Sequence, residues 1–167
     1  MRILGVCGSL QAKSSNLSLL QMASSMVPEG IEFVLYDGIR DLPHFNPEIE
    51  ASGVPPAVAD WRRAIAASDA LLIASPEYGH SLPGALKNAI DWVIGSGELE
   101  RKVTGVTAAT PGRERGRLGL QALRGTLGAV SARIVGGEPI ARGPSFESEL
   151  QALLSALIDA ARAPLEP

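Results

Sequence analysis

Two short segments of the sequence carry residue types suited to holding a small phosphorylated molecule with a flat ring. The first, residues 8–16 (GSLQAKSSN), is small and rich in hydroxyl groups, and apolar residues at helical spacing follow it. Gly8 lets the backbone approach a ligand, serine hydroxyls can donate, and a helix start adds free N–H groups and partial positive charge. This composition favours phosphate binding. The hydroxyl donors are Ser9, Ser14 and Ser15.

The second segment follows a buried-looking strand, LLIAS at residues 71–75, and reads PEYGHS over residues 76–81. It combines a rigid turn, an acid, an aromatic ring and a bare backbone position, which together suit a planar ring. Ser81 is expected to cap the next helix, whose apolar positions recur at helical spacing. Those apolar positions are Leu86, Ala89, Ile90 and Val93.

The hydroxyl-rich segment also has a simpler interpretation. Ser14, Ser15 and Asn16 are typical helix N-cap residues and need no ligand to explain them. The segment matches neither G-x-G-x-x-G nor G-x-x-x-x-G-K-S/T, which argues against a Rossmann dinucleotide site and a P-loop nucleotide triphosphatase.

Strand-like runs alternate with helical patterns along the whole chain. We expect strands at residues 2–7, 31–36, 71–75, 103–109 and 132–135, each followed by a helix, and in the first helix Leu17, Leu20, Ala23 and Val27 share one face. Such alternation predicts an α/β doubly wound five-stranded parallel sheet of order 2-1-3-4-5, with helices on both faces. In that order the segments after strands one and three flank one crevice at the switch point. Residues 37–56, with four prolines, are expected to fold near it.

Length and composition set the broad class. The 167 residues, 46% of them hydrophobic, predict a single domain over residues 1–167. The net charge of −3 provides no basic surface for nucleic acid, and no segment approaches the roughly 18 apolar residues of a membrane span. Cys7 is the single cysteine, so we expect no intrachain disulfide, no metal and a cytoplasmic location.

These motifs resemble one known family. GSLQAKSSN and, further on, SPEYGHSLPGALKNAIDWV are similar to the NADPH-dependent FMN reductases of the flavodoxin-like superfold, which include chromate and quinone reductases and some azoreductases. Members often carry arginine at the position of Gln11 and asparagine at that of Gly79. The resemblance implies FMN as cofactor and NADPH or NADH as electron donor. The implied phosphate-binding positions are Ser9, Gln11, Ser14 and Asn16, and the implied ring-binding positions are Pro76, Glu77, Tyr78, Gly79 and Gly112.

The implied activity is electron transfer through FMN to a quinone, another flavin, an azo compound or a metal oxyanion in a ping-pong cycle. No catalytic side chain is expected, because the flavin carries the chemistry. The family also implies a homodimer or homotetramer, with Ala85, Ala89, Trp92 and residues 37–56 as contact candidates. Two alternatives stay open: an electron carrier of the flavodoxin type without nicotinamide activity, and an FMN-binding or interaction module without redox function.

Overall fold

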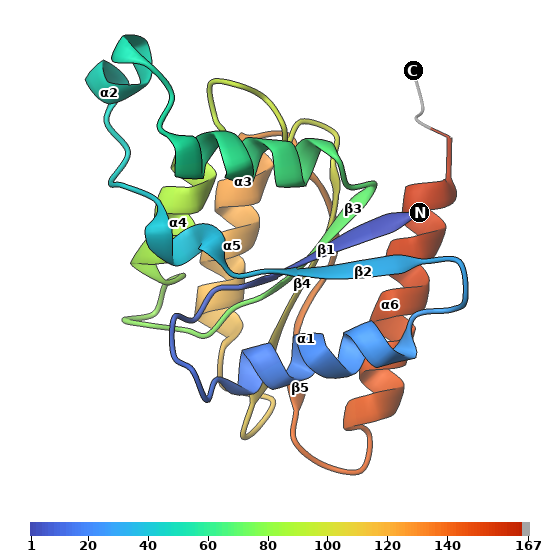
Figure 1. Ribbon diagram of the computed structural model, residues 1–167. Coiled ribbons are helices and arrows are strands. Elements are labelled where there is room, and N and C mark those ends of the chain that lie inside the picture. The colour runs from blue at the N-terminus through green and yellow to red at the C-terminus, as the bar shows by residue number, and fades with distance from the viewer. Residues whose placement is uncertain (165–167) are drawn as a thin grey trace.

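Five parallel strands form one sheet in the order β2-β1-β3-β4-β5 in the computed structural model, which describes residues 1–164 (Figure 1). This topology confirms the predicted sheet. The strand bounds are β1 (Arg2–Cys7), β2 (Glu32–Tyr36), β3 (Ala70–Ala74), β4 (Val103–Thr110) and β5 (Arg133–Ala141). Because successive side chains of a strand point to opposite faces, Leu71 packs into one apolar core and Leu72 into the other. The middle strand β3 (Ala70–Ala74) is therefore apolar throughout.

Helices cover both faces of the sheet. On one face lie α1 (Ser15–Met26) and α6 (Phe146–Arg162), and on the other lie α3 (Pro56–Ala66), α4 (Gly84–Asp91) and α5 (Arg117–Ala129) (Figure 1). The predicted core face of α1 is partly wrong. Leu19, Leu20 and Ala23 are buried, whereas Leu17 is only half-buried, so the buried stripe is rotated relative to the prediction.

Strand β5 is longer than the sequence predicts. The expected strand stops at Val135 because Gly136 and Gly137 resemble a break, but β5 continues through both glycines to Ala141. Val106 pairs with Gly136 and Ala108 with Pro139, so β5 holds one extra residue in a β-bulge. The two glycines have φ values of +75° and +113°, which other residues rarely adopt.

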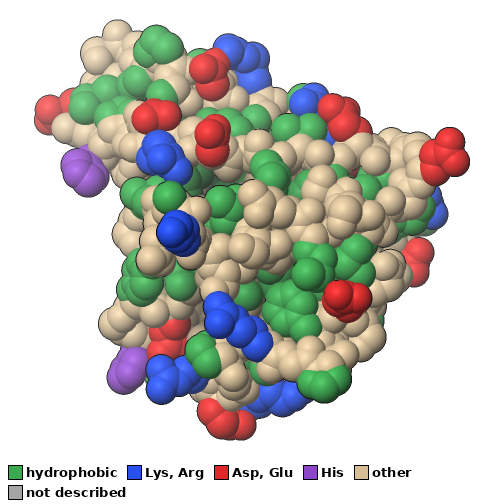
Figure 2. Space-filling view, turned by 60° about the horizontal axis from the view of Figure 1, so that its bottom comes forward, with side chains coloured by type: hydrophobic (Ala, Val, Ile, Leu, Met, Phe, Trp, Pro, Cys, Tyr) green, Lys and Arg blue, Asp and Glu red, His purple; other side chains and the backbone are tan. Residues whose placement is uncertain are grey.

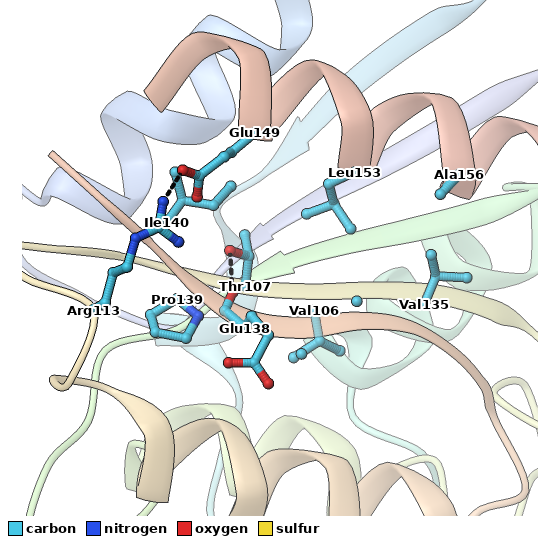
Figure 3. Close-up of a pocket in the computed structure, with 12 residues that line it drawn as sticks. Val106, Thr107, Arg113, Val135, Glu138, Pro139, Ile140, Glu149, Leu153 and Ala156 are labelled. Atoms are coloured by element: carbon cyan, nitrogen blue, oxygen red, sulfur yellow. Dashed lines mark hydrogen bonds and ion pairs between the residues drawn. The ribbon is translucent and has the colours of Figure 1, made fainter. Parts of the chain in front are cut away.

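Thr107 stabilises the bulge, since its hydroxyl donates a hydrogen bond to the carbonyl oxygen of Glu138 over 3.0 Å (Figure 3). A cavity of about 270 Å³ lies between the bulge and α6. Leu153 and Val135 point into this cavity from opposite walls (Figure 3). The bulge therefore borders a cavity at the sheet edge while the strand continues past it.

Residues 37–56, called the excursion below, fold against α4, with a 3₁₀ turn (η1, Gly38–Asp41) and a short helix (α2, Pro47–Ser52). The Asn88 side chain accepts a hydrogen bond from the Phe45 N–H over 2.8 Å and donates to the Pro43 carbonyl over 2.9 Å. The indole of Trp92 donates to the same carbonyl over 2.7 Å. Ala89 and Trp92 are fully buried within the chain, so their expected role in a subunit contact is wrong.

Charged side chains are mixed by sign over the face seen in Figure 2, with acidic groups between the basic ones. Within residues 1–164, no helix has the length and hydropathy needed to cross a bilayer.

We expect Asn88→Ala to release the start of the excursion, because both hydrogen bonds of the amide are lost. A loss of about 1–3 kcal/mol in unfolding free energy is anticipated. Hydrogen exchange at the Phe45 amide should quicken while β3 stays protected. Lys87→Ala, at the exposed neighbouring position, is the matched control. Unchanged exchange at Phe45 would contradict the assigned role of Asn88.

Candidate functional site

The loops that follow the neighbouring strands β1, β3 and β4 lie side by side at the carboxyl edge of the sheet. Backbone pairing continues one residue beyond the strands: the Gly8 N–H donates to Ala74 O over 2.8 Å, and the Ser75 N–H donates to Thr107 O over 2.9 Å. A Cβ at Gly8 would lie 2.8 Å from the Ser75 hydroxyl oxygen, so glycine permits this close approach. Residues 8–16, 76–81 and 110–116 thus leave adjacent strands, as the predicted switch point requires.

The serines of residues 8–16 shape the segment through local hydrogen bonds. Ser14 is the N-cap of α1, and its hydroxyl accepts from the Asn16 N–H over 3.2 Å, which confirms the N-cap interpretation for this residue. The Ser9 hydroxyl accepts from the Gln11 N–H, also over 3.2 Å. Ser9, Ser14 and Asn16 are buried, whereas the Gln11 side chain is exposed.

Several backbone donors of the same segment remain unused. Within residues 1–164, no hydrogen bond uses the backbone N–H groups of Leu10, Ala12, Lys13 or Ser15. Free N–H groups beside a helix N-terminus are the donor set that a phosphate group requires. The residues present therefore fit the phosphate of FMN.

Asn16 and Ser15 have partners from distant parts of the chain. The Asn16 side-chain oxygen accepts from the Ala109 N–H over 2.9 Å, which ties the start of α1 to β4. The Ser15 hydroxyl accepts a hydrogen bond from the guanidinium of Arg142. The Asn16 carboxamide oxygen thus braces the fold, and Ser15 lies beside a cation that sequence reasoning did not select.

Residues 78–81 form a tight turn in which Tyr78 and Ser81 exchange two backbone hydrogen bonds of 3.0 Å. The central residues, Gly79 and His80, have φ values of +56° and +61°, as a type I′ turn requires. Ser81 is therefore not the helix cap that its sequence position suggests, since α4 begins at Gly84 with Pro83 before it. The Ser81 backbone instead closes this turn, before the helix begins.

The Tyr78 side chain brings the two segments together. Its hydroxyl oxygen lies 3.4 Å from that of Ser9, while 54% of the residue surface stays exposed. Pro76, beside it, is half-buried. An aromatic surface thus stands open next to the phosphate-compatible segment.

Glu77 faces the neighbouring helix. Its carboxylate accepts a hydrogen bond from the Gly119 N–H over 2.9 Å, in the first turn of α5. That helix has no side-chain cap of its own, because its N-cap is Gly116, so Glu77 supplies the favourable negative charge from 42 residues away. A Cβ at Gly119 would lie 2.9 Å from Cα of Glu77 and 3.1 Å from the Ser81 carbonyl oxygen. Gly119 was not among the predicted site residues, because only this long-range contact reveals it.

Two side-chain contacts fix the third segment, residues 110–116. The Thr110 hydroxyl donates to the Gly112 carbonyl over 3.0 Å, and Arg113 forms an ion pair with Glu149 of α6 (Figure 3). A hydrogen bond from Ser145 and the Arg113 charge lower the pKa of the Glu149 carboxyl. Space is open around Gly112, where a Cβ would meet nothing within 4 Å.

The fold defines a doubly wound α/β protein with three adjacent loops at the carboxyl edge of its sheet, and comparison with known proteins gives the family. The sequence model of the NADPH-dependent FMN reductases matches residues 1–143. The chain therefore belongs to the NADPH-dependent FMN reductase family.

Two relatives and two solved structures illustrate the likeness. An NAD(P)H-dependent FMN reductase of Pseudomonas aeruginosa is 44% identical over 119 residues, covering 71% of this chain and 63% of the relative. A quinone reductase of Pseudomonas putida is 37% identical over 110 residues, covering 64% and 59%. The chain thus spans about three fifths of these relatives.

Among solved structures, FerB, a flavoenzyme NAD(P)H:(acceptor) oxidoreductase from Paracoccus denitrificans, shares 27% identity with a TM-score of 0.84 and coverage of 96% of each chain. An NADH:FMN oxidoreductase (EMOB), solved in its apo form, shares the fold with a TM-score of 0.76 at 18% identity, covering 99% of this chain and 91% of its own.

Gly119→Ala is expected to lower the unfolding free energy by about 1–3 kcal/mol, because the added methyl group meets backbone that cannot move aside. Gly125→Ala, on the same helix with open space around it, should instead add up to about 1 kcal/mol. Urea unfolding of both variants measures the contrast. Equal changes in unfolding free energy for the two variants would show that α5 does not pack tightly against residues 77–81.

Proposed function

We propose that the protein is an FMN-containing oxidoreductase that takes electrons from NADPH or NADH and passes them to a small acceptor. The observation that carries this proposal is the family match over residues 1–143, which spans the three segments at the carboxyl edge. The unused N–H groups and the open Tyr78 ring support it, because they provide donors for a phosphate and a surface for a ring on neighbouring segments.

In this proposal the backbone of residues 8–16 holds the FMN phosphate and the backbone of residues 76–79 faces the ring. Bound FMN would supply the hydride chemistry, while the chain supplies binding, orientation and electrostatics. No side chain is assigned a catalytic role. The proposed cofactor-binding residues are Ser9, Gln11, Ser14, Ser15, Asn16, Pro76, Glu77, Tyr78, Gly79 and Gly112.

Donor and acceptor would use one exposed ring face in turn, in a ping-pong cycle. Relatives named quinone reductases favour a quinone, although a flavin, an azo compound or a metal oxyanion would need only similar access to the ring. We assign the activity to the cytoplasm, where the unpaired Cys7 would stay reduced.

We also infer a homodimer or homotetramer built through the excursion. This segment exposes three large apolar side chains, Phe45, Ile49 and Val54. Helix α2 buries none of its residues within the chain, so its apolar side chains lack a partner there. A second copy would cover them.

The direct test is to add FMN to the purified protein and then NADPH under anaerobic conditions. We expect a bound yellow flavin that bleaches, and parallel double-reciprocal plots when the concentrations of NADPH and a quinone are both varied. Bound flavin that NADPH does not bleach would favour an electron carrier. Absence of FMN binding would overturn the proposal.

Ile49→Glu is expected to reduce the molar mass measured by light scattering to that of one chain, because a charge in an apolar contact is costly to desolvate. Leu118→Glu is the control, since Leu118 is similarly exposed but lies on α5. An unchanged molar mass for Ile49→Glu would show that the excursion does not form the subunit contact.

A further inference from the structure

A polar hollow of about 390 Å³ lies at the amino edge of the sheet, at the opposite ends of the strands from the loops that follow β1, β3 and β4. Its lining comes from the places where β3, β4 and β5 begin and where α6 ends, and includes Asp69, Lys102, Arg133 and Ala161. The segments that precede parallel strands meet at one edge of a sheet, so residues distant in the sequence come together here.

Cations outnumber acids around this hollow. The cations are Arg101, Lys102 and Arg133, and the acids are Asp69 and Glu100. The Asp69 carboxylate already accepts a hydrogen bond from the Arg2 backbone N–H over 2.7 Å. Within residues 1–164, the Arg133 guanidinium makes no hydrogen bond and no ion pair. Its donors are therefore available to an anion from outside the chain.

Lys102 has a different environment from the other lysines of the sequence. Its side chain is half-buried and its amine donates a hydrogen bond to the Ser68 carbonyl oxygen. Lys13 is exposed, and Lys87, also exposed, forms an ion pair with Asp91 over 2.6 Å. Among residues 1–164, Lys102 forms no ion pair. Its charge is thus desolvated without a close carboxylate to balance it.

This environment favours the neutral form of the Lys102 amine. Burial lowers the pKa of Lys102, and the negative charge of Asp69 opposes the shift without cancelling it. The other charged groups that line the hollow are Glu100, Arg101 and Arg133. The neutral amine is the nucleophilic form of lysine, so more of Lys102 than of an ordinary lysine is able to react near neutral pH.

We propose that Lys102 is a site of acylation by small acyl phosphates, whose phosphate group is held by the guanidinium of Arg133. An acyl phosphate joins an electrophilic carbonyl carbon to an anion, and the hollow has the two matching groups, an amine and a cation. Guanidinium donors suit phosphate oxygens, and their charge stabilises the departing phosphate. This inference concerns the amino edge of the sheet and does not depend on FMN binding.

The reaction needs no other co-reactant. The neutral amine nitrogen attacks the carbonyl carbon and an N–C bond forms. The bond from that carbon to the phosphate oxygen breaks, inorganic phosphate leaves with the bonding electron pair, and the nitrogen releases one proton to water. The amide product is uncharged and keeps one N–H for the Ser68 carbonyl oxygen, so acylation removes a half-buried charge and retains this hydrogen bond.

The first test follows acetylation of the full chain by acetyl phosphate near neutral pH. The sequence contains three lysines, so peptide mass spectrometry measures the rate at each one separately. We expect Lys102 to react several-fold faster than Lys13 and Lys87, which serve as internal controls. Equal rates at the three lysines, or a slower rate at Lys102, would overturn the proposal.

The second test compares acetyl phosphate with a neutral acetylating reagent, N-hydroxysuccinimidyl acetate. Arg133→Gln should slow the reaction of Lys102 with acetyl phosphate about 10-fold, as expected for the loss of one charge-assisted hydrogen bond, and leave its reaction with the neutral reagent unchanged. Arg124→Gln, which replaces an exposed arginine on α5, is the matched control and should react like the parent.

The neutral reagent distinguishes a phosphate contact from a change in the fold. Slowing of acetyl phosphate alone in Arg133→Gln would support the proposal. Equal slowing of both reagents would overturn it, because the neutral reagent has no phosphate for Arg133 to hold. The parent rate with acetyl phosphate in Arg133→Gln would overturn it as well.

Discussion

The site depends on parallel pairing that persists after the strands end. The N–H groups of Gly8 and Ser75 each donate to the neighbouring strand, so the first residues of two loops still belong to the hydrogen-bonded sheet. Neighbouring strands lie only about 4.8 Å apart, and this spacing brings the loops after β1, β3 and β4 together. The absence of a side chain at Gly8 is a condition for that arrangement, because any Cβ would meet Ser75.

Several polar and charged side chains at this edge of the sheet serve as braces. Asn16 binds the backbone of β4 through its oxygen, Glu77 binds the start of α5, and Arg113 binds Glu149. A loop fixed in this way keeps its backbone in one conformation, which reduces the entropy lost when a ligand binds. In the proposed complex, recognition therefore falls to backbone N–H groups of residues 8–16 and to the backbone of the 78–81 turn, both held in place by charged and polar neighbours.

Apolar runs and their alternation predicted the sheet order and both helix layers, because a strand buried on both faces, such as Ala70–Ala74, is a continuous apolar run in the sequence. Contacts between distant residues were not predictable in the same way. Gly136 and Gly137 resemble a strand end when only local propensity is considered, and Ser81 resembles an N-cap until its backbone is seen to pair with Tyr78. The contact between Glu77 and Gly119 links two loops 42 residues apart, so no local spacing marks it.

An edge strand is the place where the sheet can accept a bulge. An extra residue in β1 or β3 would break pairing on both sides, whereas β5 pairs only with β4 in this sheet. The bulge also twists an exposed edge, which discourages pairing with another chain. The same irregularity sets the register of Arg142 against Thr110 and so places a positive charge next to α1. Edge protection and cation placement thus follow from a single inserted residue, because both depend on the course of β5 after Gly136, which pairs with Val106 of β4.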